Sequence, residues 1–301
     1  MDFAEAFVDP PMIENPGSGA MAATSTGDPA QAFTLRNAEY LSDESEFLLR
    51  LNAALRRQPR GGRQILLYIH GFNTRFPDAV LRAAQISNNV GLPNVPVVFS
   101  WASRGNIFDY AYDNNSALVA RAELGRFLVL LENSAAEKIN VVAHSLGNML
   151  FVESLIQLKL RGGAPKKGKI GLIFLASPDI DYDVFKSQLE QLGRPEVPYF
   201  ILLSKDDQAL GLSTAIAGGR PRLGDYSNPQ ELTALGATVI DATDVAAQDP
   251  AHHDKYAKIA PIAPQLIKAF RQSSPMQSAR WAQTYAPVAL GGAVLQVYSG
   301  R

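Results

Sequence analysis

The stretch Val141-Val142-Ala143-His144-Ser145-Leu146-Gly147-Asn148-Met149-Leu150 decides the fold. An apolar, β-branched run leads into a small-x-Ser-x-Gly turn and a helix-period segment leaves it, which is the pattern of a nucleophile elbow with Ala143 at the usual first glycine. Larger side chains two before or two after the serine would strike the neighbouring strand and helix. Such a turn exposes the Ser145 hydroxyl at a helix N-terminus, where developing negative charge is favoured. The flanking strand and helix distinguish Ser145 from an ordinary serine and predict that it is a nucleophile.

The composition is that of a globular enzyme. The chain has 301 residues, of which 47% are hydrophobic and 19% charged, with a formal net charge of −1. This balance argues against a nucleic-acid partner. Because there is no cysteine, thiolate nucleophiles, disulfides and cysteine-based metal sites are excluded. Histidine chemistry is confined to four residues, which are His70, His144, His252 and His253.

Apolar runs alternate with helix-period segments after Gln64. The predicted strands are Ile65–Ile69, Val95–Phe99, Lys138–Ala143, Ile170–Ala176, Pro198–Leu203 and Ala237–Asp241. The predicted helices are Asp43–Leu55, Asp78–Val90, Ser116–Glu132, Leu146–Leu160, Asp183–Leu192, Gln208–Ala217 and Lys255–Arg271. Near-continuous apolar strands separated by amphipathic helices predict a mostly parallel sheet with helices on both faces. Ligands of such sheets bind at the carboxyl ends of the strands.

The chain divides into three expected segments. Residues 1–35, rich in Pro, Gly, Ala, Ser and Thr, predict an extended N-terminal arm, 36–272 the catalytic domain, and 273–301 a tail packed on or near that domain. The acidic start does not fit a signal peptide. The apolar stretch 285–298 is too short to span a bilayer, so no membrane association is expected, and the compartment stays open.

A second motif, Tyr68-Ile69-His70-Gly71-Phe72-Asn73-Thr74, ends the first of these strands. Acyl transfer needs two backbone N–H groups aimed at the oxyanion, one from the residue after the nucleophile and one from a loop after an early strand. We expect Leu146 to supply the first and Phe72 the second, with Asn73 as the alternative. His70 is expected to be structural and to hold this loop by a side-chain hydrogen bond.

The general base is expected in a late loop. The side chain of His144 should point away from the Ser145 hydroxyl, and His70 belongs to the oxyanion loop. This leaves His252 and His253, which follow the last predicted strand, where this type of fold carries its histidine. Spacing does not separate the two. A paired-histidine metal site would need further ligands at metal-site spacing, and none accompanies them.

The acid that orients the histidine should lie at a strand end between the nucleophile and the base. Two loops qualify, one with Asp206 and Asp207 and one with Asp179 and Asp181. The acid usually follows the penultimate strand, which favours Asp206 or Asp207. Helix N-capping is the alternative role for each aspartate, because both loops precede predicted helices.

Six motifs occur in one order along the chain. They are His70-Gly71-Phe72-Asn73-Thr74, Phe99-Ser100-Trp101-Ala102-Ser103-Arg104-Gly105, Ala143-His144-Ser145-Leu146-Gly147-Asn148, Ala176-Ser177-Pro178-Asp179-Ile180-Asp181, Arg220-Pro221-Arg222-Leu223-Gly224 and His253-Asp254-Lys255-Tyr256. Together they resemble a bacterial α/β-hydrolase family of esterase/lipase-superfamily proteins whose physiological role is unassigned. The resemblance spans about Phe33 to Arg271 and implies an α/β-hydrolase fold and serine ester hydrolysis.

The resemblance also implies roles for individual residues. Ser145 is similar to the family nucleophile, and Asp207 matches the aspartate of its Ser-x-x-Asp-x-Ala-Leu segment. His253 matches the histidine that stands three residues before an aromatic one, here Tyr256. Two mild departures lie outside this triad: Ala102 stands where the family often has Pro, and Leu146 where it often has Met.

The sequence thus predicts a serine carboxylesterase with Ser145, His253 and Asp207 as its triad, Phe72 and Leu146 as oxyanion donors, and no cofactor or metal. The same machinery would serve an acyltransferase, a thioesterase or a polyester hydrolase. A non-catalytic binding module is the alternative from another class, although every catalytic role has a candidate residue. The segment 177–197 holds about 20 residues, most of them one helix, so no large cap is expected. The expected substrates are therefore small or short-acyl esters.

Overall fold

The computed structural model describes residues 1–12, 32–193, 195–247, 249–262, 288–290 and 293–299. Its main sheet has eight strands in the order β4-β3-β5-β6-β7-β8-β10-β9. These strands are β3 (Gln64–Ile69), β4 (Val95–Phe99), β5 (Lys138–His144), β6 (Ile170–Ala176), β7 (Tyr199–Leu203), β8 (Thr238–Asp241), β9 (Val288–Leu290) and β10 (Ala293–Ser299). The six strands from β4 to β8 are parallel, and β10 and β9 pair antiparallel at one edge. The predicted α/β class and all six predicted strands are confirmed.

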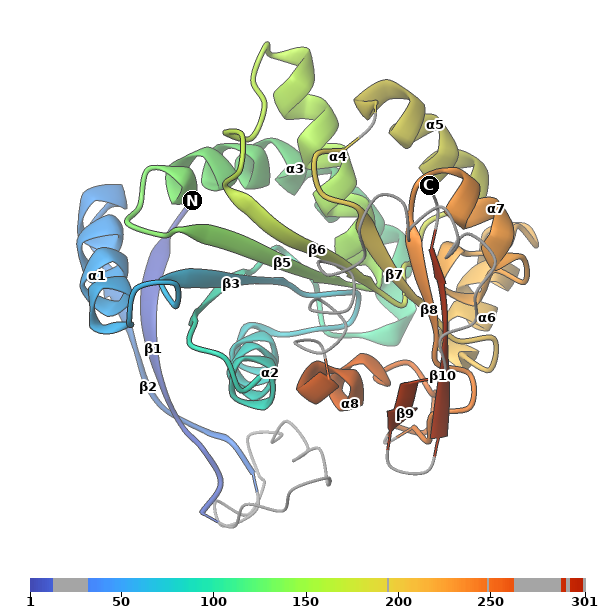
Figure 1. The fold of residues 1–301 in the computed structure, drawn as a ribbon, viewed down its shortest axis with the longest axis horizontal. Coiled ribbons are helices and arrows are strands. Elements are labelled where there is room, and N and C mark those ends of the chain that lie inside the picture. Colours follow the sequence, from blue (N-terminus) through green and yellow to red (C-terminus); the bar gives the residue numbers. More distant parts are fainter. Residues whose placement is uncertain (13–31, 194, 248, 263–287, 291–292, 300–301) are drawn as a thin grey trace.

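Helices cover both faces of the sheet (Figure 1). One face carries α1 (Glu44–Arg57), α3 (Tyr110–Glu132), α4 (Leu146–Leu160) and α5 (Tyr182–Leu192), and the other carries α2 (Phe76–Asn89) and α8 (Tyr256–Ile259). Alternate strand residues divide the core accordingly: Leu67 and Val141 pack in the cluster on the α4 side, whereas Leu66 and Val142 pack in the cluster on the α2 side. Burial on both faces explains why these strands are apolar throughout.

Shorter elements complete the described chain. The connection from β7 to β8 contains α6 (Gln208–Ile216), the 3-10 turn η2 (Leu223–Asp225) and α7 (Pro229–Ala234), and two further 3-10 turns are η1 (Ile107–Asp109) and η3 (Ala260–Ile262). Between β6 and β7 the described residues form a single helix, α5. Of the helix expected at Lys255–Arg271, the described residues form α8 and η3, and the rest of the expected range, 263–271, lies outside the described residues.

The N-terminal and C-terminal parts of the described chain also form strands. In the N-terminal segment, β1 (Phe3–Asp9) pairs antiparallel with β2 (Thr34–Leu41). In the C-terminal segment, β10 pairs Gln296–Ser299 with Thr238–Asp241 of β8. The boundaries at residues 35 and 272 stay a prediction. No helix in the described part of the chain is long and apolar enough to cross a membrane.

Candidate active site

The elbow serine is held in a strained turn. Ser145 joins β5 to α4 with φ 53° and ψ −125°, a conformation that costs a non-glycine residue about 1–3 kcal/mol. Its N–H donates to the Ala176 carbonyl at 3.0 Å. The buried Asn148 amide donates to the Ser145 carbonyl at 2.8 Å and to the Ala176 carbonyl at 3.0 Å. Asn148 therefore ties the elbow to the neighbouring strand, a role that sequence reasoning did not assign to it.

Two glycines let the oxyanion loop approach the elbow. A Cβ on Gly71 would lie 2.6 Å from the Ser145 Cβ and 3.0 Å from the His144 carbonyl oxygen. A Cβ on Gly147 would collide with the His70 carbonyl and lie 2.8 Å from the Ile69 carbonyl oxygen. Because real Cβ atoms do not approach other atoms this closely, both positions require glycine. The end of β3 and the start of α4 thus meet backbone to backbone.

The candidate acid, Asp207, and the candidate base, His253, lie side by side on the loops that follow β7 and β8. The distance from His253 Nδ1 to Asp207 Oδ2 is 2.7 Å, and the Asp207 side chain is closed off from solvent. The other Asp207 oxygen accepts the Leu210 N–H at 3.0 Å and caps α6. One carboxylate thus makes both the expected contact with His253 and the alternative capping contact, and the cap helps to orient the oxygen that faces His253.

The other aspartates considered from the sequence have different partners. Asp206 pairs with His252, with 2.8 Å between Oδ2 and Nδ1. Asp179 is buried and accepts hydrogen bonds from Tyr110 and Ser213, and Asp181 caps the N-terminus of α5. Within the described part of the chain, no group of three His, Cys, Asp or Glu side chains is placed to hold a metal ion.

The surroundings of His253 fit the role of base that the sequence predicts. Its Nδ1–H donates to Asp207, while Nε2 has no hydrogen-bond partner among the described residues and is not sealed from solvent. Burial alone lowers the pKa of His253, but the hydrogen bond and negative charge of Asp207 outweigh it, so the pKa is raised above 6.5. The neighbouring carboxylates of Asp254 and Asp179 act in the same direction.

His253 lies against the elbow. The Ser177 hydroxyl donates to the His253 carbonyl at 3.2 Å, and the Asp179 N–H donates to the Ser145 carbonyl at 3.2 Å. The rings of His253 and His144 are 4.7 Å apart. In the described structure no hydrogen bond joins the Ser145 hydroxyl to His253, and neither side chain's free polar atom is sealed off. Catalytic hydrogen bonds often tighten only when substrate binds.

His144 packs against His253 at the side of the candidate site. It is buried, its ring packs on those of His253 and Tyr256, and its Nε2 lies without a hydrogen bond 3.7 Å from Asp254. Burial holds the pKa of His144 well below 6.5, and the nearby His253 adds to this effect. A neutral ring fits the expectation that His144 is not the base.

Two backbone N–H groups lack acceptors beside the serine. Among the described residues, nothing accepts from the N–H of Phe72, in the loop after β3, or from the N–H of Leu146, in the first turn of α4. The N–H of Asn73, the alternative donor, is taken by the Asp113 carboxylate at 3.2 Å. The free N–H groups are therefore the two expected from the sequence as oxyanion donors.

The oxyanion loop has two buried supports. His70 donates from Nδ1 to the Gly71 carbonyl at 2.9 Å and accepts the Trp101 N–H on Nε2 at 3.1 Å. Burial lowers the pKa of His70 to about 4, so the ring stays neutral. Asp113 binds the N–H groups of Asn73 and Arg104 and the Ser103 hydroxyl. His70 was expected here, whereas Asp113 was missed because it lies 40 residues from Asn73 on α3.

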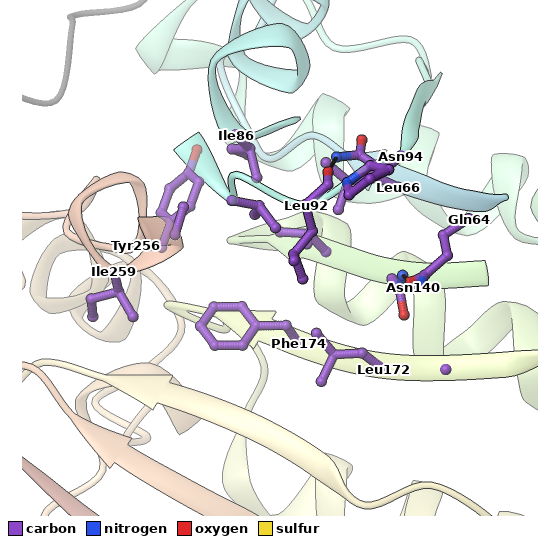
Figure 2. Close-up of a pocket in the computed structure, with 15 residues that line it drawn as sticks. Gln64, Leu66, Ile86, Leu92, Asn94, Asn140, Leu172, Phe174, Tyr256 and Ile259 are labelled. Carbon is purple, nitrogen blue, oxygen red and sulfur yellow. Dashed lines mark hydrogen bonds between the residues drawn. The ribbon is translucent and has the colours of Figure 1, made fainter. Parts of the chain in front are cut away.

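A separate apolar cavity of about 130 Å³ lies on the α2 and α8 face of the sheet (Figure 2). Its walls include Leu66, Leu172, Phe174 and Tyr256, and none of the candidate catalytic residues. Tyr256 is shared, because its ring also packs on His144. The candidate catalytic residues are therefore not part of this cavity.

A family model described as an alpha/beta hydrolase of unknown function (DUF900) matches residues 43–270. No curated protein matches the chain. Matching solved structures include an esterase from Pyrobaculum calidifontis, 12% identical, with 72% of this chain and 77% of that one covered and a TM-score of 0.37. A protein named DphMB1 is 14% identical, with 68% and 77% covered and a TM-score of 0.33.

Proposed function

The chain belongs to this α/β-hydrolase family of unknown function, and we propose that it is a serine carboxylesterase acting on small or short-acyl esters. The observation that carries the proposal is the Asp207–His253 pair, packed against an elbow serine with a free hydroxyl and two unused N–H donors. A merely structural strand–helix junction would not need the strained Ser145 backbone.

The reaction follows from these positions. His253 Nε2 takes the proton of the Ser145 hydroxyl as its oxygen attacks the ester carbonyl, and Asp207 holds Nδ1–H and stabilises the imidazolium. The Phe72 and Leu146 N–H groups hold the oxyanion, a contribution of about 3–4 kcal/mol for each donor. The imidazolium then protonates the leaving alkoxide. Water, activated by His253, hydrolyses the acyl-enzyme and restores Ser145.

The proposal of small or short-acyl esters rests on how open the candidate active site is to substrate. The connection from β6 to β7, where a cap could be inserted, contains only α5 among its described residues. We therefore expect p-nitrophenyl acetate and butyrate to be cleaved with higher kcat/KM than long-chain esters. The same triad would act on thioesters or transfer the acyl group to another alcohol, and adding such substrates or acceptors to the assay distinguishes these reactions.

The decisive test is covalent labelling with a fluorophosphonate probe, mapped by mass spectrometry on the wild type, Ser145→Ala and His253→Ala. We expect one adduct on the peptide that contains Ser145, absent in Ser145→Ala and weakened in His253→Ala. Circular dichroism would check that both variants are folded. A folded wild type without an adduct would overturn the proposal and favour a binding module.

The pH dependence of kcat/KM should report His253. Only its neutral form accepts the serine proton, so activity should fall as pH drops through its pKa, with a midpoint above 6.5. His144 stays neutral over this range and adds no second step. Hydrolysis of a soluble ester between about pH 5 and 9 measures the midpoint. A midpoint below 6.5 would mean that the Asp207 charge does not stabilise the imidazolium.

A further inference from the structure

Beside the Asp207–His253 pair stands a second acid–histidine pair of the same geometry. His252 Nδ1 lies 2.8 Å from Asp206 Oδ2, and His253 Nδ1 lies 2.7 Å from Asp207 Oδ2. Both pairs join residues 46 positions apart. The loop with Asp206 and Asp207 and the loop with His252 and His253 thus contact each other through two adjacent Asp–His pairs.

The two pairs differ in exposure to solvent. The Asp207–His253 pair is buried, with 14% of the His253 side chain and none of the Asp207 side chain exposed. The Asp206–His252 pair lies at the surface, with 40% of the His252 side chain and 37% of the Asp206 side chain exposed. Because this second pair faces solvent, its geometry needs support from other groups.

A buried lysine supplies that support. The Lys255 side chain is 1% exposed, and its ammonium donates to Asp206 Oδ1 at 2.5 Å and to the carbonyls of Ala242 and Thr243. The Ser204 hydroxyl also binds Asp206 Oδ1. Burial would raise the pKa of Asp206, but these hydrogen bonds and that of His252 lower it, so the carboxylate is ionised.

The histidine loop is held in the same register by its backbone. The Gln208 N–H donates to the Ala251 carbonyl at 2.9 Å, and the Asp249 carboxylate accepts the N–H groups of His253 and Asp254. His252 has a φ of 58°, in the left-handed region. This reversal between consecutive residues turns the two rings onto their separate carboxylates.

Because two aspartates stand next to each other opposite two adjacent histidines, the two loops could pair in more than one register. A shift of the histidine loop by one residue would bring His252 to Asp207 and remove His253 from the elbow. We propose that Asp206, His252 and Lys255 are positioning residues that fix the register in which His253 pairs with Asp207. This inference rests on the proposed esterase function. His252 is then not a base. It belongs to the group Asp206, His252 and Lys255, called the positioning group below, which aligns His253.

Four variants test the positioning group, at a temperature where circular dichroism shows each variant to be folded. Asp206→Asn keeps the shape but removes the charge that Lys255 binds. His252→Ala removes the donor to Asp206, whereas His252→Asn keeps an N–H donor and a residue type that tolerates the left-handed region. Asp183→Asn is the matched control, because it breaks an exposed ion pair with Arg220 at 3.4 Å.

We expect kcat for p-nitrophenyl acetate to fall about 10-fold or more in Asp206→Asn and His252→Ala, with KM within about twofold, because misalignment of a base by a fraction of an ångström affects chemistry rather than binding. His252→Asn should regain most of the lost kcat, and Asp183→Asn should match the wild type. The downfield proton NMR signal of the His253 Nδ1–H should broaden or disappear in the two damaging variants alone.

The outcomes separate the two proposals. Wild-type protein that neither reacts with the fluorophosphonate nor cleaves the ester would refute the esterase function. If the wild type is active and both Asp206→Asn and His252→Ala keep its kcat and its His253 signal, the role of the positioning group is refuted. Inactive His252→Asn beside active His253→Asn would also refute it, because His252 would then be the base.

Discussion

Replacing Asp207 by asparagine is expected to lower kcat about 10⁴-fold while leaving the chain folded. The carboxylate accepts Nδ1–H of His253 at 2.7 Å and, through its other oxygen, the Leu210 N–H at 3.0 Å. Asparagine is as good an N-cap as aspartate, so α6 should keep its first turn. The amide carries no charge to stabilise the imidazolium, and its N–H₂ group favours the wrong histidine tautomer.

The measurement is kcat for a soluble p-nitrophenyl ester together with the thermal unfolding midpoint of Asp207→Asn. The neighbouring Asp206→Asn is the matched control, since it removes the same charge one residue away and is expected to cost about 10-fold. The pKa of His253 should also fall in Asp207→Asn, because burial would then act with less opposition. Equal losses in the two variants would contradict the assignment of Asp207 as the catalytic acid.

The central sheet could be predicted because its strands are buried on both faces. Such strands are short, continuous apolar runs, and the six predictions agree with β3 to β8. Strand β2 was missed because Asn37–Tyr40 is exposed and carries no apolar period. Strand β10 joins β8 from a distant part of the chain, and no local pattern encodes that antiparallel pairing. Helix α3 begins at Tyr110 rather than Ser116, since its first turn buries the polar Asp113 and has no apolar stripe.

The candidate site could be predicted where its constraints are local. The elbow needs small residues at fixed spacing around Ser145, so the motif shows in the sequence. The choice between adjacent residues could not be made from spacing alone, because Asp206 and Asp207 both face a histidine. The supports Asp113 and Asn148 act through contacts across the fold, and buried polar residues of this kind leave no periodic signal.

A single methyl group at Gly147 is expected to destabilise the protein by about 3 kcal/mol, because overpacking a rigid backbone contact forces it apart. The added Cβ would lie 2.8 Å from the Ile69 carbonyl oxygen and would also strike the His70 carbonyl. Both carbonyls belong to the end of β3 and the loop after it, which carries Phe72. They cannot move away without disturbing the parallel pairing of β3 with β5 and the expected oxyanion donor.

Urea unfolding of Gly147→Ala measures this cost, and Gly211→Ala in α6 is the matched control. Nothing lies within 4 Å of a Cβ on Gly211, so alanine there should be neutral or stabilise α6 by up to about 1 kcal/mol. Gly147→Ala should therefore unfold at lower urea than the wild type and lose esterase activity, while Gly211→Ala keeps both. Equal midpoints for the two variants would mean that α4 and the end of β3 can separate freely. The close backbone contact would then not be what holds the elbow against the oxyanion loop.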